Sequence, residues 1–328
     1  MERLVDGFGR AITSLRISVT DRCNLRCTYC MPEHGATFLP RTELLSYEEI
    51  ERLVGVAAAV GVSEVRLTGG EPLVRRDLPE LVRRLARLPV EDLSLTTNGV
   101  LLERHLPALV AAGLRRVNVS LDAVQAHRFA QITRRDELPA VMAALRACED
   151  HPQLRPIKVN AVAQRGVTDD EVLGLAELAR RRPYIVRFIE FMPLDADAAW
   201  SPADVLTGDE IRDRIDARWP LVELPAPAAS TSRRFAFADG AGEVGFINPV
   251  SQPFCRTCDR IRLTADGQLR TCLFSTREHD LRAVMRDGGD DATLLEALRA
   301  AVGQKELKHR INEPGFVPAS RSMHQIGG

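Results

Sequence analysis

Short runs in which apolar and polar residues alternate recur along the first two thirds of the chain, and longer amphipathic runs separate them. The short runs predict six strands: Leu15–Thr20, Glu64–Thr68, Asp92–Thr97, Arg116–Leu121, Ile157–Ala163 and Ile185–Phe191. The longer runs predict helices, among them Tyr47–Val60, Leu78–Leu88, Leu101–Ala112 and Asp169–Arg181. Because strands that alternate with helices build β-α-β units, we predict a parallel sheet.

Along these strands, one face is apolar and the other is polar. Leu15, Ile17 and Val19 alternate with Arg16 and Ser18, and the later strands carry Ser, Thr, Asn or Lys in the same manner. An open parallel sheet covered on both faces has nearly all-apolar strands. A polar face instead predicts a curved sheet with helices outside and a ligand-filled interior. Since a closed barrel of this type has eight strands, we predict an α/β fold with an incomplete (β/α)6 barrel.

The pattern changes after Trp219. Prolines and small residues through Ser232 predict a linker. Beyond it the sequence predicts strands at Phe235–Ala238 and Glu243–Ile247, a hairpin over Ile261–Cys272 turning at Asp266-Gly267, and helices at Leu281–Arg286 and Thr293–Val302. We therefore expect a partial barrel over residues 1–229 and a smaller α+β domain over residues 230–328.

Composition narrows the classes of partner. The 328 residues include 44 basic and 45 acidic ones, for a net charge of −1, whereas proteins that bind nucleic acid or anionic membranes are usually basic. No apolar run reaches the roughly 18 residues of a membrane span, and the N-terminus lacks the apolar core of a signal peptide. We expect a cytoplasmic protein with neither nucleic acid nor membrane as a partner.

Three cysteines follow the first predicted strand directly. Cys23, Cys27 and Cys30 lie within eight residues, and the total of seven cysteines is a poor disulfide framework. Thiolates bind iron–sulfur clusters and zinc. Three of them would leave one iron of a four-iron cluster open, while a structural zinc site needs a fourth ligand, for which His34 is a candidate.

This triplet resembles the signature of the radical S-adenosylmethionine (SAM) superfamily, C-x₃-C-x₂-C with an aromatic residue before the last cysteine, here Tyr29. The superfamily's second mark, a GGEP-like run ending the second strand, is matched by Gly69-Gly70-Glu71-Pro72. The resemblance implies a 4Fe–4S cluster on the triplet and reductive cleavage of SAM to a 5′-deoxyadenosyl radical. It also implies SAM contacts from the matching positions, which are Tyr29, Gly70, Ser120 and Met192.

A second cysteine triplet lies in the predicted C-terminal domain. Cys255, Cys258 and Cys272 again offer three thiolates, and a zinc site completed by His279 is the alternative to a second cluster. The seventh cysteine, Cys148, lies in an amphipathic run and is expected to be a small buried apolar residue.

The segments around the second triplet, together with others spread over nearly the whole chain, resemble the GTP 3′,8-cyclase family of molybdenum-cofactor biosynthesis. The matching segments include Leu15–Cys30, Arg66–Pro72, Thr96–Gly99, Asn118–Asp122, Lys158–Asn160, Arg187–Met192, Gly245–Cys255 and the final Gly327-Gly328. The resemblance implies a second 4Fe–4S cluster that binds GTP. It also implies hydrogen abstraction from ribose C3′, followed by attack of C3′ on guanine C8.

The same resemblance assigns residues and partners. Matching positions imply GTP contacts from Arg16, Arg66, Thr96, Lys158, Arg260, Ile261 and Arg262, and catalytic roles for Arg260, Arg262 and the terminal Gly327 and Gly328. It implies an electron donor such as flavodoxin or ferredoxin, a downstream cyclic pyranopterin monophosphate synthase, and a monomer or homodimer.

Two other functions stay open at this point. One is a radical SAM enzyme whose second cluster transfers electrons during peptide modification, although such relatives usually carry more C-terminal cysteines. The other is a zinc-stabilised nucleotide-binding module without catalysis, which would contain stoichiometric zinc and no iron.

Overall fold

The computed structural model describes every residue except 1, 226, 228 and 328. Twelve strands form one curved sheet, in the order β12-β11-β10-β1-β2-β3-β4-β5-β6-β9-β8-β7. The strands are β1 (Ser14–Ser18), β2 (Glu64–Thr68), β3 (Asp92–Thr97), β4 (Arg116–Ser120), β5 (Ile157–Ala163), β6 (Tyr184–Glu190), β7 (Leu221–Leu224), β8 (Arg233–Phe237), β9 (Glu243–Ile247), β10 (Arg260–Leu263), β11 (Gln268–Arg270) and β12 (His279–Asp280).

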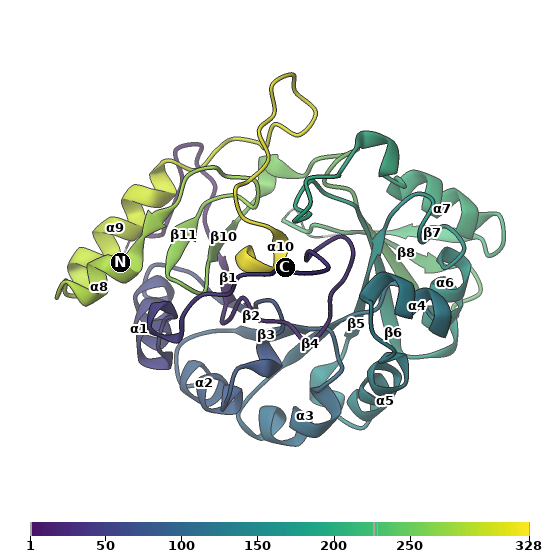
Figure 1. Ribbon diagram of the computed structural model, residues 1–328, viewed down its shortest axis with the longest axis horizontal. Helices are drawn as coiled ribbons and strands as arrows, with labels where there is room; N and C mark the ends of the chain where they lie inside the picture. The colour runs from purple at the N-terminus through teal and green to yellow at the C-terminus, as the bar shows by residue number, and fades with distance from the viewer. Residues whose placement is uncertain (1, 226, 228, 328) are drawn as a thin grey trace.

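Helices cover the convex side of the sheet, and α10, near the C-terminus, lies inside its curve (Figure 1). The helices are α1 (Tyr47–Ala58), α2 (Leu78–Leu85), α3 (Leu102–Ala111), α4 (Ala126–Thr133), α5 (Leu138–Glu149), α6 (Val172–Arg181), α7 (Gly208–Asp216), α8 (Leu281–Arg286), α9 (Asp291–Gly303) and α10 (Met323–Ile326). An α/β partial barrel with helices outside is thus confirmed.

The six predicted barrel strands are all present, and the parallel part of the sheet extends beyond them. β10 pairs in parallel with β1 at one end, and β9 pairs in parallel with β6 at the other. Both added strands come from beyond residue 230, so the sheet crosses residue 230 without a break. The division into parts 1–229 and 230–328 stays a prediction.

Local signals explain where several elements begin and end. Ser46 Oγ accepts a hydrogen bond from the Glu49 amide at 3.1 Å, and the Ser46 amide donates to Glu49 Oε2 at 2.7 Å, which caps α1. β1 ends at Ser18 rather than at Thr20, because the Thr20 carbonyl turns to accept from the Gly70 amide at 2.7 Å. The hairpin turn at Asp266-Gly267 is confirmed between β10 and β11.

The one-sided strand pattern separates core from cavity. Leu15, Ile17, Val65 and Leu67 are fully buried on the side that the helices cover, and the polar residues between them face the interior of the curve. Burial of this apolar face holds the helices on the outside, so the polar side chains are left to line the concave side.

The predicted linker is wrong over Leu221–Leu224. These four residues form β7, which pairs antiparallel with β8 and ends the sheet. The prolines around it stand at the strand's boundaries, where proline does not interrupt a ladder of hydrogen bonds. Among the described residues no helix is both long and apolar enough to cross a membrane.

Candidate active site

A single cavity on the concave side collects most of the residues singled out from the sequence. Its volume is about 300 Å³. Residues from both cysteine triplets and from the inward faces of the strands line it: Arg16, Cys23, Cys27, Tyr29, Cys30, Arg66, Gly70, Thr96, Ser120, Met192, Cys255, Cys258, Arg260, Arg262 and Cys272. Segments far apart in sequence therefore share one chamber.

The first triplet lies in the loop after β1, at the carboxyl end of the strands. Burial raises the pKa of Cys23 to about 11 and that of Cys30 to about 12. Thiols held in this state ionise when a metal neutralises them, so the donor set fits a thiolate-bound cluster. His34 points away, because its side chain is 90% exposed and lies beside Glu33.

Two glycines bring backbone to the edge of this chamber. A Cβ placed on Gly70 would lie 2.5 Å from the Arg22 carbonyl oxygen, and one on Gly69 would lie 2.5 Å from the Thr20 carbonyl oxygen. Any side chain would therefore clash with the loop that carries the cysteines. Glycine is required here by close packing, which fits a site where a ligand's polar groups meet bare backbone.

The acidic residue of the same run, Glu71, is fully buried and organises the neighbouring strand end. Its carboxylate accepts from the Leu73 amide at 3.0 Å, Thr97 Oγ1 at 2.8 Å and the Asn98 amide at 2.7 Å. Burial raises the pKa of Glu71 to about 7. Asn98 in turn donates to Cys23 Sγ at 3.7 Å, so Glu71 supports the first triplet indirectly.

Tyr29 is held by a residue that the sequence analysis did not assign. Its hydroxyl donates to Asp122 Oδ2 at 2.7 Å, and Asp122 Oδ1 accepts from the Val162 amide at 2.8 Å. Asp122 lines the cavity together with Ser120 and Met192. The four residues that the resemblance relates to SAM, including Gly70, therefore line the same cavity as the first triplet.

The second triplet lines the same cavity as the first. Cys255 and Cys258 flank a short turn, and Cys272 follows β11. Although burial opposes ionisation, the neighbouring Arg260 and Lys305 cations lower the pKa of Cys258. The Lys305 ammonium is itself buried and donates to the Arg260 carbonyl at 2.9 Å.

The candidate zinc ligand for this triplet lies elsewhere. His279 belongs to β12 and pairs with Leu269, and it is not one of the cavity residues. His309 and His324 do line the cavity, and the sequence analysis missed both. In the part of the chain that the structure describes, no three Cys, His, Asp or Glu side chains converge closely enough to hold a single metal ion.

A row of arginines crosses the chamber floor on three adjacent parallel strands. Arg16 on β1 is in register with Arg262 on β10 and with Arg66 on β2, and neighbouring strands lie about 4.8 Å apart. Burial and mutual repulsion lower the pKa of Arg16 well below its usual value, and burial lowers those of Arg66 and Arg262 to about 10. With pKa values near 10, Arg66 and Arg262 still carry charge near neutral pH.

The arginines of this row donate hydrogen bonds to neutral acceptors. Arg66 Nε donates to Ser94 Oγ at 3.4 Å, and Arg262 Nη1 donates to the Gly327 carbonyl at 2.8 Å. Among the described residues Arg16 Nε has no acceptor at all although it is buried. Such concentrated, uncompensated positive charge fits a polyanionic ligand such as a phosphate chain.

Further cations extend this row toward β6. Lys158 is in register with Asn118, and burial followed by repulsion from Arg187 lowers its pKa to about 7. Arg187 donates to Asn160 Oδ1 at 2.9 Å and to Asn118 Oδ1 at 2.8 Å, and it lines the cavity. In the sequence, Arg187 is a charged residue within a mostly apolar strand. A charge in that position is a signal for a site residue, and the sequence analysis did not use it.

Two of the residues predicted to contact GTP have side chains that do not line the cavity. Lys158 is half-buried and is not one of the residues that line the cavity. Ile261 is fully buried on the helix-covered face between Arg260 and Arg262, so only its backbone could meet a ligand. Arg260 and Arg262 point the same way, as the two-residue period of a strand requires.

The described part of the C-terminal tail reaches the chamber, where Met323 and His324 line its wall. Gly327 has a positive φ of 87°, and a Cβ there would clash with Thr68 Oγ1 at the end of β2. The preceding Ile326 is 1% exposed, so the tail is packed and Gly327 lies close to the GGEP run. Gly328 lies outside the described residues.

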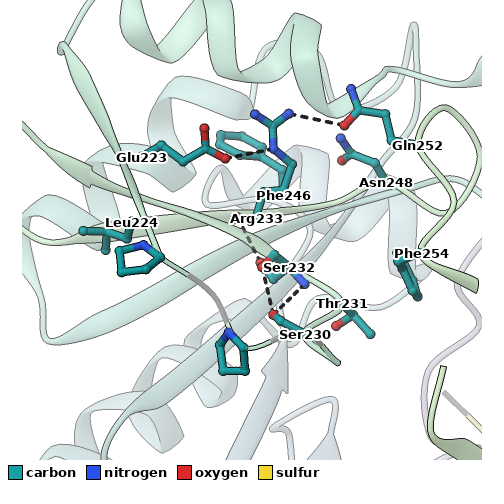
Figure 2. A pocket seen from close by; sticks show the side chains of 12 residues that line it. Glu223, Leu224, Ser230, Thr231, Ser232, Arg233, Phe246, Asn248, Gln252 and Phe254 are labelled. Atoms are coloured by element: carbon teal, nitrogen blue, oxygen red, sulfur yellow. Dashed lines mark hydrogen bonds and ion pairs between the residues drawn. The ribbon is translucent and has the colours of Figure 1, made fainter. Parts of the chain in front are cut away.

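A second pocket adjoins this chamber beside β7 and β8. Figure 2 shows Arg233 between Glu223, at 3.2 Å, and Gln252, at 3.3 Å. Thr231 and Phe254 line both spaces. None of the candidate cluster, SAM or GTP residues predicted from the sequence lines this second pocket.

Comparisons with known proteins agree with this architecture. Family models described as the Radical SAM superfamily and as Molybdenum Cofactor Synthesis C match residues 17–179 and 184–311. Structures of Streptococcus suis SuiB bound to S-adenosylmethionine and of native anSMEcpe with bound AdoMet share the fold. They align with TM-scores of 0.60 and 0.58 at 12% and 14% identity, over 88% and 91% of this chain and 68% and 82% of theirs.

Curated relatives are much closer in sequence. The GTP 3′,8-cyclases of Rhodopirellula baltica and Mycolicibacterium smegmatis are each 48% identical, over 99% of this chain and 92% of the relative. A protein of Mycobacterium tuberculosis named GTP 3′,8-cyclase 2 is 47% identical over the same shares. The chain therefore belongs to the GTP 3′,8-cyclase family of the radical SAM superfamily.

Proposed function

We propose that this protein converts GTP to (8S)-3′,8-cyclo-7,8-dihydroguanosine 5′-triphosphate, the first step of molybdenum-cofactor biosynthesis. The observation that carries the proposal is the arrangement of the chamber: two open cysteine triplets face one space, and an unneutralised arginine row runs along its floor. This layout suits a substrate with a polyanionic end and a reacting end.

The residues present fit two 4Fe–4S clusters, one held by Cys23, Cys27 and Cys30 and the other by Cys255, Cys258 and Cys272. When bound, the first cluster and SAM would supply the 5′-deoxyadenosyl radical that takes a hydrogen atom from ribose C3′. Joining C3′ to guanine C8 would then require one further electron, from the one-electron donor, and one proton to complete the dihydroguanosine product. The protein's own contribution is to bind, orient and exclude water.

The arginine row binds the triphosphate. Arg16, Arg66 and Arg262 present guanidinium groups side by side, and each charge-assisted hydrogen bond contributes about 1.5–3 kcal/mol. Arg187 and Lys158 extend this charge toward β6, and Thr96 adds a hydroxyl from β3. A triphosphate held along the floor leaves the nucleoside between the two triplets.

The second triplet takes the guanine end. Arg260 lies beside Cys258, and the backbone of Ile261 connects Arg260 to Arg262. Since Gly327 accepts from Arg262, the tail lies where the triphosphate row meets the reacting end. We assign Arg260, Arg262 and the terminal Gly327 and Gly328 to the catalytic machinery, and Tyr29, Gly70, Ser120 and Met192 to SAM.

The reaction needs partners of defined chemistry. A low-potential one-electron donor, such as flavodoxin or ferredoxin, would reduce the first cluster, and a cyclic pyranopterin monophosphate synthase would consume the product. We place the reaction in the cytoplasm, carried out by a monomer or a homodimer.

Anaerobic reconstitution tests the proposal. We expect about eight irons per chain, from two four-iron clusters, and SAM cleavage that depends on GTP. Cleavage that is indifferent to GTP would contradict the proposal, and stoichiometric zinc in place of iron would favour the nucleotide-binding module.

A single variant separates the roles of the two triplets. We expect Cys272→Ala to retain SAM cleavage at the first triplet but to lose conversion of GTP. If GTP conversion survives in this variant, the assignment of the second triplet to the substrate is wrong.

A further inference from the structure

The C-terminal tail reaches the chamber through a stretch of chain with little support of its own. Residues 312–320 are half-exposed or exposed and include two prolines and a glycine. α10 contains only four residues, and helices shorter than about 12 residues are marginal by themselves. Contacts with the rest of the protein must therefore determine where Gly327 lies.

Arg321 makes the strongest polar contacts of the tail, directly before Ser322 caps α10. Its guanidinium donates to both oxygens of Asp266, at 3.0 and 2.9 Å, and Nη2 also donates to Glu278 Oε2 at 2.9 Å. The side chains of Arg321, Asp266 and Glu278 are only 20%, 10% and 22% exposed. A forked, partly buried pair of this kind is stronger than an exposed one.

Through Asp266, these contacts attach the tail to the hairpin of β10 and β11. Asp266 forms the turn between β10 and β11, where Thr264 Oγ1 donates to its Oδ1 at 2.6 Å. The same hairpin carries Arg262, which donates to the Gly327 carbonyl. The tail is therefore joined to one hairpin at two points, Arg321 before α10 and Gly327 after it.

The ion-pair network also reaches the loop of the second triplet. Glu278 pairs with the buried Arg270, and Arg270 donates to the Leu273 carbonyl at 3.4 Å. Leu273 directly follows Cys272. Glu278 and Arg270 thus connect the anchor of the tail to the residue that follows the third cysteine of the second triplet.

We propose that Arg321 is a positioning residue, which acts through Asp266 and Glu278 to hold Gly327 against Arg262 at the chamber. The attachment follows from the contacts alone, and its consequence for turnover rests on the proposed function. Without Arg321 the described part of the tail keeps the Arg262 bond, the Met323 amide bond to the Leu194 carbonyl at 3.0 Å, the contact of His324 Nδ1 with the Cys30 carbonyl at 3.4 Å, and the burial around Ile326.

Hydrogen exchange in the reconstituted full-length protein, measured without GTP, tests the attachment. We expect Arg321→Gln to accelerate amide exchange over residues 322–327 at least tenfold, equivalent to about 1.4 kcal/mol. Arg321→Lys keeps the charge but loses the fork, so its exchange should fall in between. The matched control is Arg310→Gln, because Arg310 is 73% exposed and pairs with Glu313 nearby; it should match the wild type.

Kinetics of the same proteins test the positioning role. We expect Arg321→Gln to lower kcat for GTP conversion at least tenfold with KM for SAM unchanged, and Arg321→Lys to recover part of the loss. Unchanged exchange in Arg321→Gln would overturn the anchor, and faster exchange with unchanged kcat would overturn the positioning role. Hydrogen exchange is measured without GTP, so it tests the anchor independently of the proposed function. If the wild-type protein fails to convert GTP, that result overturns the proposed function and leaves the anchor to the exchange data.

Discussion

Arg16 and Arg262 lie in register on adjacent parallel strands although they come from opposite ends of the chain. Arg262 is buried and Arg16 is half-buried, and desolvation together with repulsion from Arg262 lowers the pKa of Arg16. The ligand-free protein therefore carries electrostatic repulsion at the place where the proposed substrate has its greatest negative charge.

Replacing Arg16 tests this relationship. We expect Arg16→Gln to weaken GTP binding about 10- to 100-fold, because a charge-assisted hydrogen bond contributes about 1.5–3 kcal/mol. The ligand-free variant should melt at an equal or higher temperature than the wild type, since a repulsive charge is gone. Calorimetric titration and thermal melts measure the two effects. Arg181→Gln, at a 75% exposed side chain, is the control, and equal GTP affinity in Arg16→Gln would contradict the assignment.

Gly70 tests the close packing of the GGEP run against the cysteine loop. Gly70→Ala places a methyl group against the Arg22 carbonyl, so the loop must move. We expect SAM affinity to fall at least tenfold and stability to decrease by about 1–3 kcal/mol. Gly303→Ala is the matched control, because a Cβ at Gly303 meets nothing within 4 Å. Equilibrium dialysis with SAM and urea unfolding distinguish the variants, and normal SAM binding by Gly70→Ala would refute the role.

Lys158 should make stability depend on pH in a defined direction. Burial and neighbouring arginines lower its pKa from 10.5 to about 7 in the folded protein. Between about pH 7 and pH 10.5 the unfolded chain therefore binds more protons than the folded one, so stability rises with pH through this window. We expect Lys158→Gln to flatten that rise relative to the wild type. Urea midpoints of the ligand-free proteins at pH 7 and pH 9 measure it, and identical slopes would rule out the effect.

The seventh cysteine provides a control for cluster assembly. Cys148 is fully buried in α5 among apolar residues, far in sequence from either triplet. We expect Cys148→Ala to keep about eight irons per chain and to lose about 1 kcal/mol of stability from the small cavity. Cys255→Ala should retain only about four irons. Iron analysis and absorption spectra after reconstitution decide between these results, and iron loss in Cys148→Ala would show that the triplets are assigned wrongly.

Local pattern alone determined a large part of the fold. The strand period of two, visible in Leu15 to Val19, separated core from cavity, and the Ser46–Glu49 capping box marked the start of α1. The spacing of Cys23, Cys27 and Cys30 pointed to a thiolate-bound centre. These features depend on neighbours within a few residues, so they can be read from the sequence.

Long-range placement could not be read in this way. Asp122 under Tyr29, Arg187 beside Asn118, and His309 and His324 at the chamber wall come together through pairing between distant segments. The sequence did not predict β7, because a short edge strand between prolines shows little alternation of apolar and polar residues. Such contacts arise from packing of the whole chain, which a local pattern does not encode.

By itself the sequence determined the chemistry that is available: two groups of three thiols, a glycine pair, and cations on one face of the strands. Only the tertiary structure decided that β10 pairs with β1. This pairing places Arg262 beside Arg16, and the two cysteine triplets line one chamber. It also decided that the tail enters that chamber, because the bonds of Arg321 to Asp266 and of Arg262 to Gly327 connect segments that no local signal relates. The physical reason is that strand register and ion pairing between remote segments follow from the packing of the complete sheet.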